Sequence, residues 1–159
     1  MRYSPFLLLG GIAAVPASAA SVNITIPALK VAEYHKPYVA VWLEPAGGGA
    51  ARTLSVWYQV KKNDKEPGTK WLSELRAWWR KGGKSLKMPA DGISGATRAP
   101  GTYSISLPAN LPAGAYILNV EAARETGGRE LVTLPISVPA KGASASGKTE
   151  LGAITLSAR

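Results

Sequence analysis

The amino-acid sequence predicts a mainly β protein: an antiparallel, Ig-like β-sandwich of about seven strands with one inserted amphipathic helix. Short runs of alternating or β-branched residues recur along the chain, with Gly, Pro and Asn turn signals between them, which is typical of sandwiches. One segment alone has the spacing of an amphipathic helix. The chain has no cysteine, so a hydrophobic core rather than disulfides must hold it together.

The N-terminus has the pattern of a secretory signal peptide. Arg2 precedes an apolar run over residues 6–15, and Ala17 and Ala19 are small residues of the kind read by a signal peptidase. The apolar run is too short to cross about 30 Å of hydrocarbon as a helix. We therefore expect residues 1–19 to be removed, and the mature chain to be exported to the periplasm without spanning a membrane.

The first half of the mature chain contains three predicted strands and the helix. The strands cover residues 22–26, 38–43 and 54–60, and the last two are joined by a glycine-rich turn that predicts a hairpin. Residues 70–81 form the predicted helix, with Thr69 able to cap its start and Gly82 and Gly83 able to end it. Its apolar face consists of Trp71, Leu72, Leu75, Trp78 and Trp79.

The second half returns to β structure. Strands are expected over residues 102–107, 115–123 and 131–138, with a hairpin turn at residues 126–128. Together these elements form a sandwich domain over residues 20–138. Residues 139–149 are rich in Ala, Ser and Gly and predict a flexible segment. Residues 150–159 supply a last strand of the sandwich.

Between the helix and the fourth predicted strand, residues 91–97 read DGISGAT. The simplest interpretation is a β-turn in which Asp91 and Ser94 bind backbone N–H groups. The pattern also resembles the flavinylation motif of exported bacterial redox proteins, such as those of the sodium-pumping NADH:quinone reductase and of the Rnf complex. In those families an ApbE-like FAD:protein FMN transferase attaches FMN to the last threonine as a phosphoester.

The resemblance makes Thr97 the site of covalent FMN attachment and assigns residues 91–98 to a flavinylation loop. Asp91 matches the leading acid of the motif, and its core is matched by Ser94, Gly95 and Ala96. Gly92 and Gly95 would give the loop the freedom to approach a bulky nucleotide. Arg98 departs from the hydroxyl residue that often follows the threonine; it could pair with the phosphate or be a surface charge.

A second resemblance covers most of the mature chain. Residues 34–42, 70–72, 78–80, 121–125 and 150–152, with the DGISGAT loop, look like an uncharacterised periplasmic family, domain of unknown function 2271. That family is similar to flavinylated proteins found beside PepSY-type membrane reductases. The resemblance implies an electron carrier between a membrane reductase and an extracytoplasmic acceptor, with iron acquisition as a context suggested by that association.

Four further residues are candidate neighbours of a flavin: Trp78, Trp79, Tyr103 and His35. For the tryptophans the alternative is burial against a sheet, as is usual for a stripe at helical spacing. For His35, the only histidine, the alternative is a structural hydrogen bond at the start of a strand. A lone histidine does not make a metal site. No catalytic set is evident, which favours a redox carrier over a stand-alone enzyme.

A rival function remains open. The formal charge is +9 for the whole chain and +8 once Arg2 is lost with the leader, so the protein suits an anionic partner. Export and the lack of a recognisable motif argue against nucleic acid. A basic, tryptophan-rich sandwich could instead be a binding module for an anionic or carbohydrate ligand without flavin. A purely structural accessory protein is a third possibility.

Overall fold

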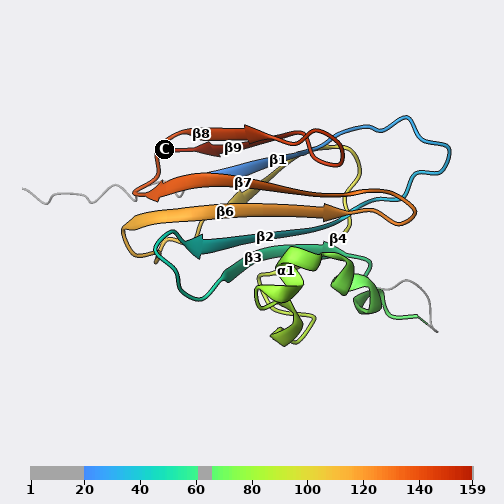
Figure 1. The fold of residues 1–159 in the computed structure, drawn as a ribbon, viewed down its shortest axis with the longest axis horizontal. Coiled ribbons are helices and arrows are strands. Elements are labelled where there is room, and N and C mark those ends of the chain that lie inside the picture. Colours follow the sequence, from blue (N-terminus) through green and yellow to red (C-terminus); the bar gives the residue numbers. More distant parts are fainter. Residues whose placement is uncertain (1–19, 61–65, 159) are drawn as a thin grey trace, which may run out of the picture.

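The computed structural model describes residues 20–60 and 66–158, and their strands form two sheets packed face to face (Figure 1). The predicted signal peptide, residues 1–19, lies outside the described residues. One sheet has four strands in the order β5-β1-β9-β8, and the other has five in the order β4-β3-β2-β6-β7. The predicted β-sandwich is therefore confirmed, with nine strands in place of about seven.

Seven of these strands correspond to predicted ones. They are β1 (Ser21–Ile26), β2 (Tyr38–Pro45), β3 (Arg52–Tyr58), β5 (Gly101–Ser106), β6 (Gly114–Ala123), β7 (Arg129–Val138) and β9 (Ala153–Ser157). Both predicted hairpins are present, because β2 pairs with β3 and β6 pairs with β7 in antiparallel register. The two unpredicted strands are short: β4 (Ser94–Ala96) and β8 (Ala143–Ser146).

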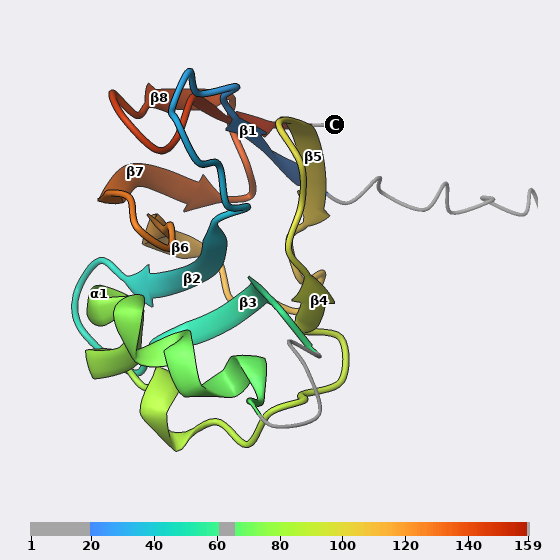
Figure 2. The same cartoon turned by 90° about the vertical axis from the view of Figure 1, so that its right-hand side faces the viewer.

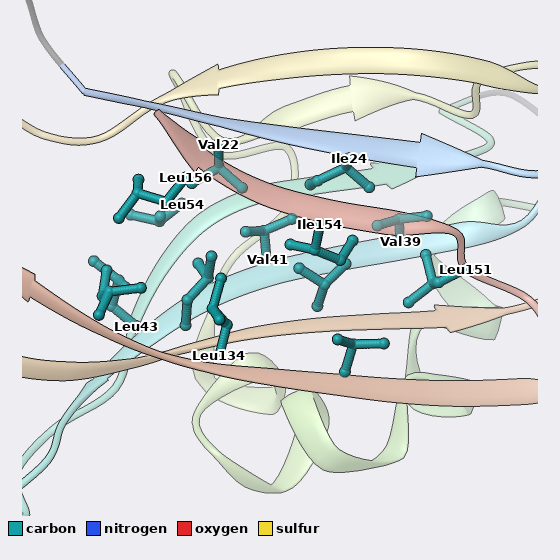
Figure 3. Close-up of a cluster of buried hydrophobic side chains, with 14 of the residues drawn as sticks. Val22, Ile24, Val39, Val41, Leu43, Leu54, Leu134, Leu151, Ile154 and Leu156 are labelled. Atoms are coloured by element: carbon teal, nitrogen blue, oxygen red, sulfur yellow. The ribbon is translucent and has the colours of Figure 1, made fainter. Parts of the chain in front are cut away.

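The main core fills the space between the two sheets (Figure 3). Alternate residues of β1, β2 and β6 point into this space, among them Val22, Val41 and Leu118, each of which is completely buried. On β3 both Leu54 and Trp57 belong to this core although they are three residues apart. A register shift between Val41 and Trp42 explains this, because an extra residue in β3 resets the alternation of side chains.

A second core lies on the opposite face of the five-stranded sheet, where the helical segment packs (Figure 2). The predicted single helix over residues 70–81 is wrong. The segment is a 3-10 helix, η1 (Gly68–Glu74), a short α-helix, α1 (Arg76–Arg80), and a 3-10 turn, η2 (Gly83–Ser85). Leu75 breaks the regular helix with φ −77° and ψ 72°.

Burial explains this interruption. Leu72, Leu75 and Trp78 are spaced by three residues and are all at most 2% exposed, and a 3-10 turn brings residues at that spacing to one side. Trp71, which the helical pattern placed on the apolar face, is 38% exposed. The predicted Thr69 cap is also absent, because Pro67 stands at the N-cap without a side-chain hydrogen bond.

The predicted flexible segment at residues 139–149 contains strand β8, which pairs with β9. Its small side chains alternate, and Ala143 and Ala145 pack against the main core. The turn that follows is held by Glu130 of β7, whose carboxylate accepts backbone N–H groups of residues 148–151 at 2.5–3.1 Å. Glu130 thereby ties the five-stranded sheet to the β8–β9 connection of the other sheet.

Candidate functional site

The DGISGAT segment begins as a turn and continues as an edge strand. Residues 91–93 form the turn, and β4 then pairs with β3 in parallel, with Ser94, Gly95 and Ala96 opposite Val56, Trp57 and Tyr58. The Val56 N–H also donates to the Ile93 carbonyl at 2.9 Å. The sequence predicted a loop over residues 91–98; its central residues instead form a strand that is paired with β3.

Three motif positions have clear structural roles. The Ser94 hydroxyl accepts the Ala90 N–H at 2.8 Å and closes the turn. Gly92 has φ +71°, a left-handed conformation that favours glycine. Gly95 lies against the indole of Trp57, and a Cβ at this position would be 3.3 Å from Trp57 Cδ1. Asp91 is exposed at the turn, and Ala96 is exposed on β4.

Thr97 follows β4 directly and is partly buried. The next residue, Arg98, is not simply a surface charge. Its guanidinium lies over the Trp57 ring at 4.3 Å from the centroid and over the Tyr103 ring at 5.0 Å, an arrangement with favourable cation–π geometry. Tyr103 meets Trp57 edge to face and donates its hydroxyl to the Ala99 carbonyl at 2.6 Å. The chain on the C-terminal side of Thr97 is therefore anchored by aromatic contacts.

Two buried polar side-chain atoms have no hydrogen-bond partner. Among the described residues, Tyr34 Oη and Trp57 Nε1 are the buried side-chain atoms without a hydrogen-bond partner. Burial raises the pKa of Tyr34, and the nearby Arg124 guanidinium acts in the opposite direction. Unpaired buried polar atoms are uncommon in folded proteins, so these two atoms are exceptions within the described part of the chain.

Strand register places Thr97 at the same end of the five-stranded sheet as one other predicted site residue, His35. Tyr58 pairs with Ala96, Tyr38 pairs with Ala123, and Ala123 pairs with Arg129. These residues form a row across the end of the sheet. His35 lies just before β2, and Arg124 directly follows β6, so segments far apart in the sequence meet here.

A pocket of about 380 Å³ opens at this end, which we call the end pocket. It lies between the start of β2, the end of β3, the β6–β7 turn and the helical segment. Its rim includes the exposed Trp71, and Tyr38 donates a hydrogen bond to the Gly68 carbonyl at 2.9 Å on its wall. The lining residues are His35, Lys36, Tyr38, Gln59, Trp71, Glu74, Arg76 and residues 123–129.

Ion pairs fix the walls of the end pocket. Arg124 binds Glu150 through two hydrogen bonds of 2.9 and 3.1 Å, with both side chains at most 7% exposed. The hydrogen bonds to Glu150 raise the pKa of Arg124. The Gly128 N–H also donates to Glu150 at 3.1 Å. A Cβ on Gly127 would lie 2.4 Å from the Arg124 guanidinium carbon, so a side chain there would push the guanidinium away from its present position.

The structure separates the four candidate flavin neighbours. His35 lines the end pocket, with Nε2 at 3.1 Å from Glu33 and Nδ1 at 3.7 Å from Glu125. Tyr103 lies beside Trp57 and Arg98. Trp78 is 1% exposed and donates its indole N–H to Thr53 at 2.9 Å, which favours the core interpretation. Trp79 packs beside it, with 6.3 Å between ring centroids.

Sequence reasoning did not single out Trp57, Tyr34, Gln59 or Arg76 as site residues. Trp57 and Gln59 lay in the predicted strand over residues 54–60, and their place beside the motif depends on the parallel β3–β4 pairing. The described residues contain no group of three or more potential metal ligands. Within the same part of the chain, no helix is long and apolar enough to cross a membrane.

Comparison with known proteins adds one finding. A family profile described as "Predicted periplasmic protein (DUF2271)" matches residues 19–153. The chain belongs to this family. The periplasmic location expected from the sequence agrees with the description of DUF2271. No curated protein matches the chain, and no solved structure matches it.

Proposed function

We propose that this periplasmic protein is a flavoprotein that carries one FMN, joined to Thr97 as a phosphoester, and that it works as an electron carrier. One observation carries the proposal. Thr97 stands between Gly95, which packs on Trp57, and Arg98, whose guanidinium lies over the same ring. An acceptor hydroxyl is thereby offered just beyond an ordered strand and next to a cation.

The residues around Thr97 fit an FMN phosphate. Arg98 supplies a positive charge, and Trp57 Nε1 is a buried donor without a partner. Gly95 leaves the edge of this indole without a Cβ against it; a Cβ at this position would lie 3.3 Å from Trp57 Cδ1. When bound, the flavin supplies one- and two-electron chemistry, while the protein supplies position and electrostatics. Arg98 would hold the phosphate end, and the sandwich would keep it fixed.

The attachment is a transfer from FAD by an ApbE-like transferase. The Thr97 hydroxyl oxygen bonds to the phosphorus of the FMN half of FAD. The bond from that phosphorus to the bridging oxygen breaks, and AMP leaves with this oxygen. The hydroxyl proton is taken up by a base of the transferase. In the proposed role, electrons reach the bound flavin from a PepSY-type membrane reductase and pass to an extracytoplasmic acceptor, with iron acquisition as a candidate context.

The first test is the intact mass of the mature protein after co-expression with an ApbE-like transferase. Wild type is expected to gain the mass of one FMN less one water. Thr97→Ala should gain nothing, because the acceptor hydroxyl is gone. Thr133→Ala, which removes an exposed hydroxyl on β7, is the matched control and should be modified like wild type. An unmodified wild type, with a transferase that modifies a known target, would contradict the proposal.

The end pocket favours one alternative function. Its exposed Trp71 and its basic residues suit a free anionic or carbohydrate ligand, which the protein would bind without flavin. Colour separates the two functions. Protein co-expressed with the transferase should be yellow and absorb in the flavin region if the first proposal holds, and colourless if the alternative holds.

A further inference from the structure

We infer that the end pocket receives the isoalloxazine ring of the Thr97-linked flavin, with Trp71 against the ring and Arg76 as the cation that favours its reduced form. This inference rests on the proposed function, because it concerns where the attached group lies. It places the redox-active isoalloxazine ring in the end pocket, away from Arg98, which would hold the phosphate.

Strand register brings Thr97 close to the pocket. Tyr58 pairs with Ala96 in the parallel β3–β4 ladder, so the next residues along the two strands are Gln59 and Thr97. Gln59 lines the end pocket. Neighbouring strands are about 4.8 Å apart, so the attachment point lies about one strand spacing from the pocket wall.

The length of the linker suits this placement. The eight bonds from the threonine oxygen through phosphate and ribityl chain to the ring span about 10 Å when extended, at roughly 1.2 Å per bond. The pocket runs along the ends of β3, β2 and β6, which are neighbours in the sheet. Two strand spacings cover about 10 Å. A flavin on Thr97 therefore reaches the pocket without moving the sheet.

The size and lining of the pocket match a flat ring with one polar edge. Its volume of about 380 Å³ lies within the range of about 300–1,000 Å³ for small-molecule sites. Trp71 offers an aromatic surface at the rim, while Gln59 and Tyr38 offer polar atoms on the wall. Arg76 and Lys36 add positive charge, which stabilises the negative charge that a reduced flavin acquires.

The aromatic cluster beside Thr97 is a poorer place for the ring. Trp57 is 1% exposed and is covered by Gly95 on one side and by the Arg98 guanidinium over its ring. Tyr103 shares the same arginine. No face of Trp57 is open for stacking, whereas Trp71 is 38% exposed although the Lys70 ammonium lies over its ring at 5.2 Å from the centroid. In this arrangement the Trp57–Arg98 pair lies next to the phosphate, and the end pocket binds the isoalloxazine ring.

The test uses flavinylated protein whose attachment has been shown by intact mass. Because an indole in contact with a flavin quenches its fluorescence, wild type is expected to be several-fold dimmer than free FMN. Trp71→Phe should recover much of that loss. Trp79→Phe is the matched control, since Trp79 lies on the same helical segment but does not line the pocket. Equal fluorescence in wild type and Trp71→Phe would overturn the inference.

A second measurement does not depend on Trp71. Arg76 and Arg80 are both exposed and lie one turn apart on α1, but only Arg76 lines the pocket. Arg76→Gln should shift the flavin midpoint potential downward, and Arg80→Gln should leave it near the wild-type value. Equal shifts in both variants, or none in either, would count against the inference.

The two proposals fail in different ways. If wild type gains no mass, the proposed flavin attachment is wrong, and the proposed ring site is therefore wrong as well. If wild type gains the mass but its flavin is as bright as free FMN, and Arg76→Gln keeps the wild-type potential, attachment stands and the end pocket is not the ring site.

Discussion

Glycine is favoured at position 95 because the backbone there packs against Trp57. A Cβ there would be 3.3 Å from Trp57 Cδ1, and the indole is completely enclosed, so it has little room to yield. We expect Gly95→Ala to lower the free energy of unfolding by about 1 kcal/mol, the lower end of the cost of overpacking. Urea unfolding of the unmodified protein measures this.

Gly47→Ala is the control for that measurement. Gly47 lies in the exposed turn between β2 and β3, where an added Cβ meets nothing within 4 Å. Its free energy of unfolding should stay within about 0.5 kcal/mol of wild type. If Gly95→Ala were equally neutral, the contact with Trp57 would not be the reason for glycine at this motif position.

For single residues, the sequence indicated the candidate attachment residue but not the residues that surround it in the fold. DGISGAT identified Thr97 as the candidate attachment residue through a resemblance to known motifs, and that assignment stays a prediction. Tyr103, six positions after Thr97, was among the candidates, but Trp57 was hidden because it is distant in sequence. Their contacts arise only when β4 pairs with β3 and the chain then crosses to β5 in the other sheet.

Among the elements, the helical segment depends on a residue from a strand. Glu121 of β6 is completely buried, and its carboxylate accepts the N–H groups of Ala77 and Trp78 at 3.1 and 2.8 Å. It also binds Arg129 at 2.9 Å. Because N–H groups in the first turn of a helix have no partner within it, this carboxylate serves as the cap that the helical sequence lacks.

Glu121→Ala is expected to lower the free energy of unfolding by about 3 kcal/mol, because it leaves two N–H groups and Arg129 without their partner. Glu121→Gln keeps an acceptor oxygen and should lose less. Urea unfolding gives the size, and hydrogen exchange at the Trp78 and Trp79 amides should show local loosening. Glu74→Ala, at an exposed carboxylate of η1, is the control. A cost below about 1 kcal/mol for Glu121→Ala would contradict the capping role.

Strands were predicted better than the helix for a physical reason. Alternation of side chains is a local property, and β1 and β7 show it clearly in their buried positions. The helix over residues 70–81 was inferred from spacing alone. Whether Leu75 continues a helix or breaks it depends on Glu121, 46 positions later, which fixes where α1 begins. That information is absent from the local pattern.

Over the whole molecule, Glu130 links the two sheets and makes stability depend on pH. Burial acts to raise its pKa, but the hydrogen bonds from backbone N–H groups, that of Lys148 first, outweigh burial and lower the pKa of Glu130 below its usual value. The unfolded chain therefore binds this proton at a higher pH than the folded chain does. The stabilisation is complete above the unfolded pKa of about 4.3 and is lost as pH falls through the lower folded pKa.

Glu130→Gln should accordingly be less stable than wild type at pH 7, and the difference should shrink as pH falls below about 4. Urea unfolding of both proteins between pH 7 and pH 3 measures this. Glu74→Gln, which removes an exposed carboxylate from the helical segment, is the control and should match wild type within about 0.5 kcal/mol at pH 7. A difference between Glu130→Gln and wild type that grows toward low pH would contradict the assigned role.

The sandwich itself could be predicted from the spacing of strands and turns, whereas the end pocket could not. Its lining comes from residues 35–38, Gln59, the helical segment and the β6–β7 turn. Nothing in the local sequence says that these four segments share one end of a sheet. The strand order β4-β3-β2-β6-β7 decides this, and strand order is set by long-range pairing.

The β3–β4 pairing has a consequence for how the protein avoids aggregation, and for the proposed modification of Thr97. Without β4, strand β3 would be the outermost strand of its sheet and would present unpaired N–H and C=O groups to other chains. Ser94–Ala96 covers this edge as a three-residue strand. Thr97 lies one residue past the covered stretch. A transferase could therefore bind the Thr97 hydroxyl while β4 remains paired with β3. Modification would then not expose the unpaired backbone groups of β3 to other chains.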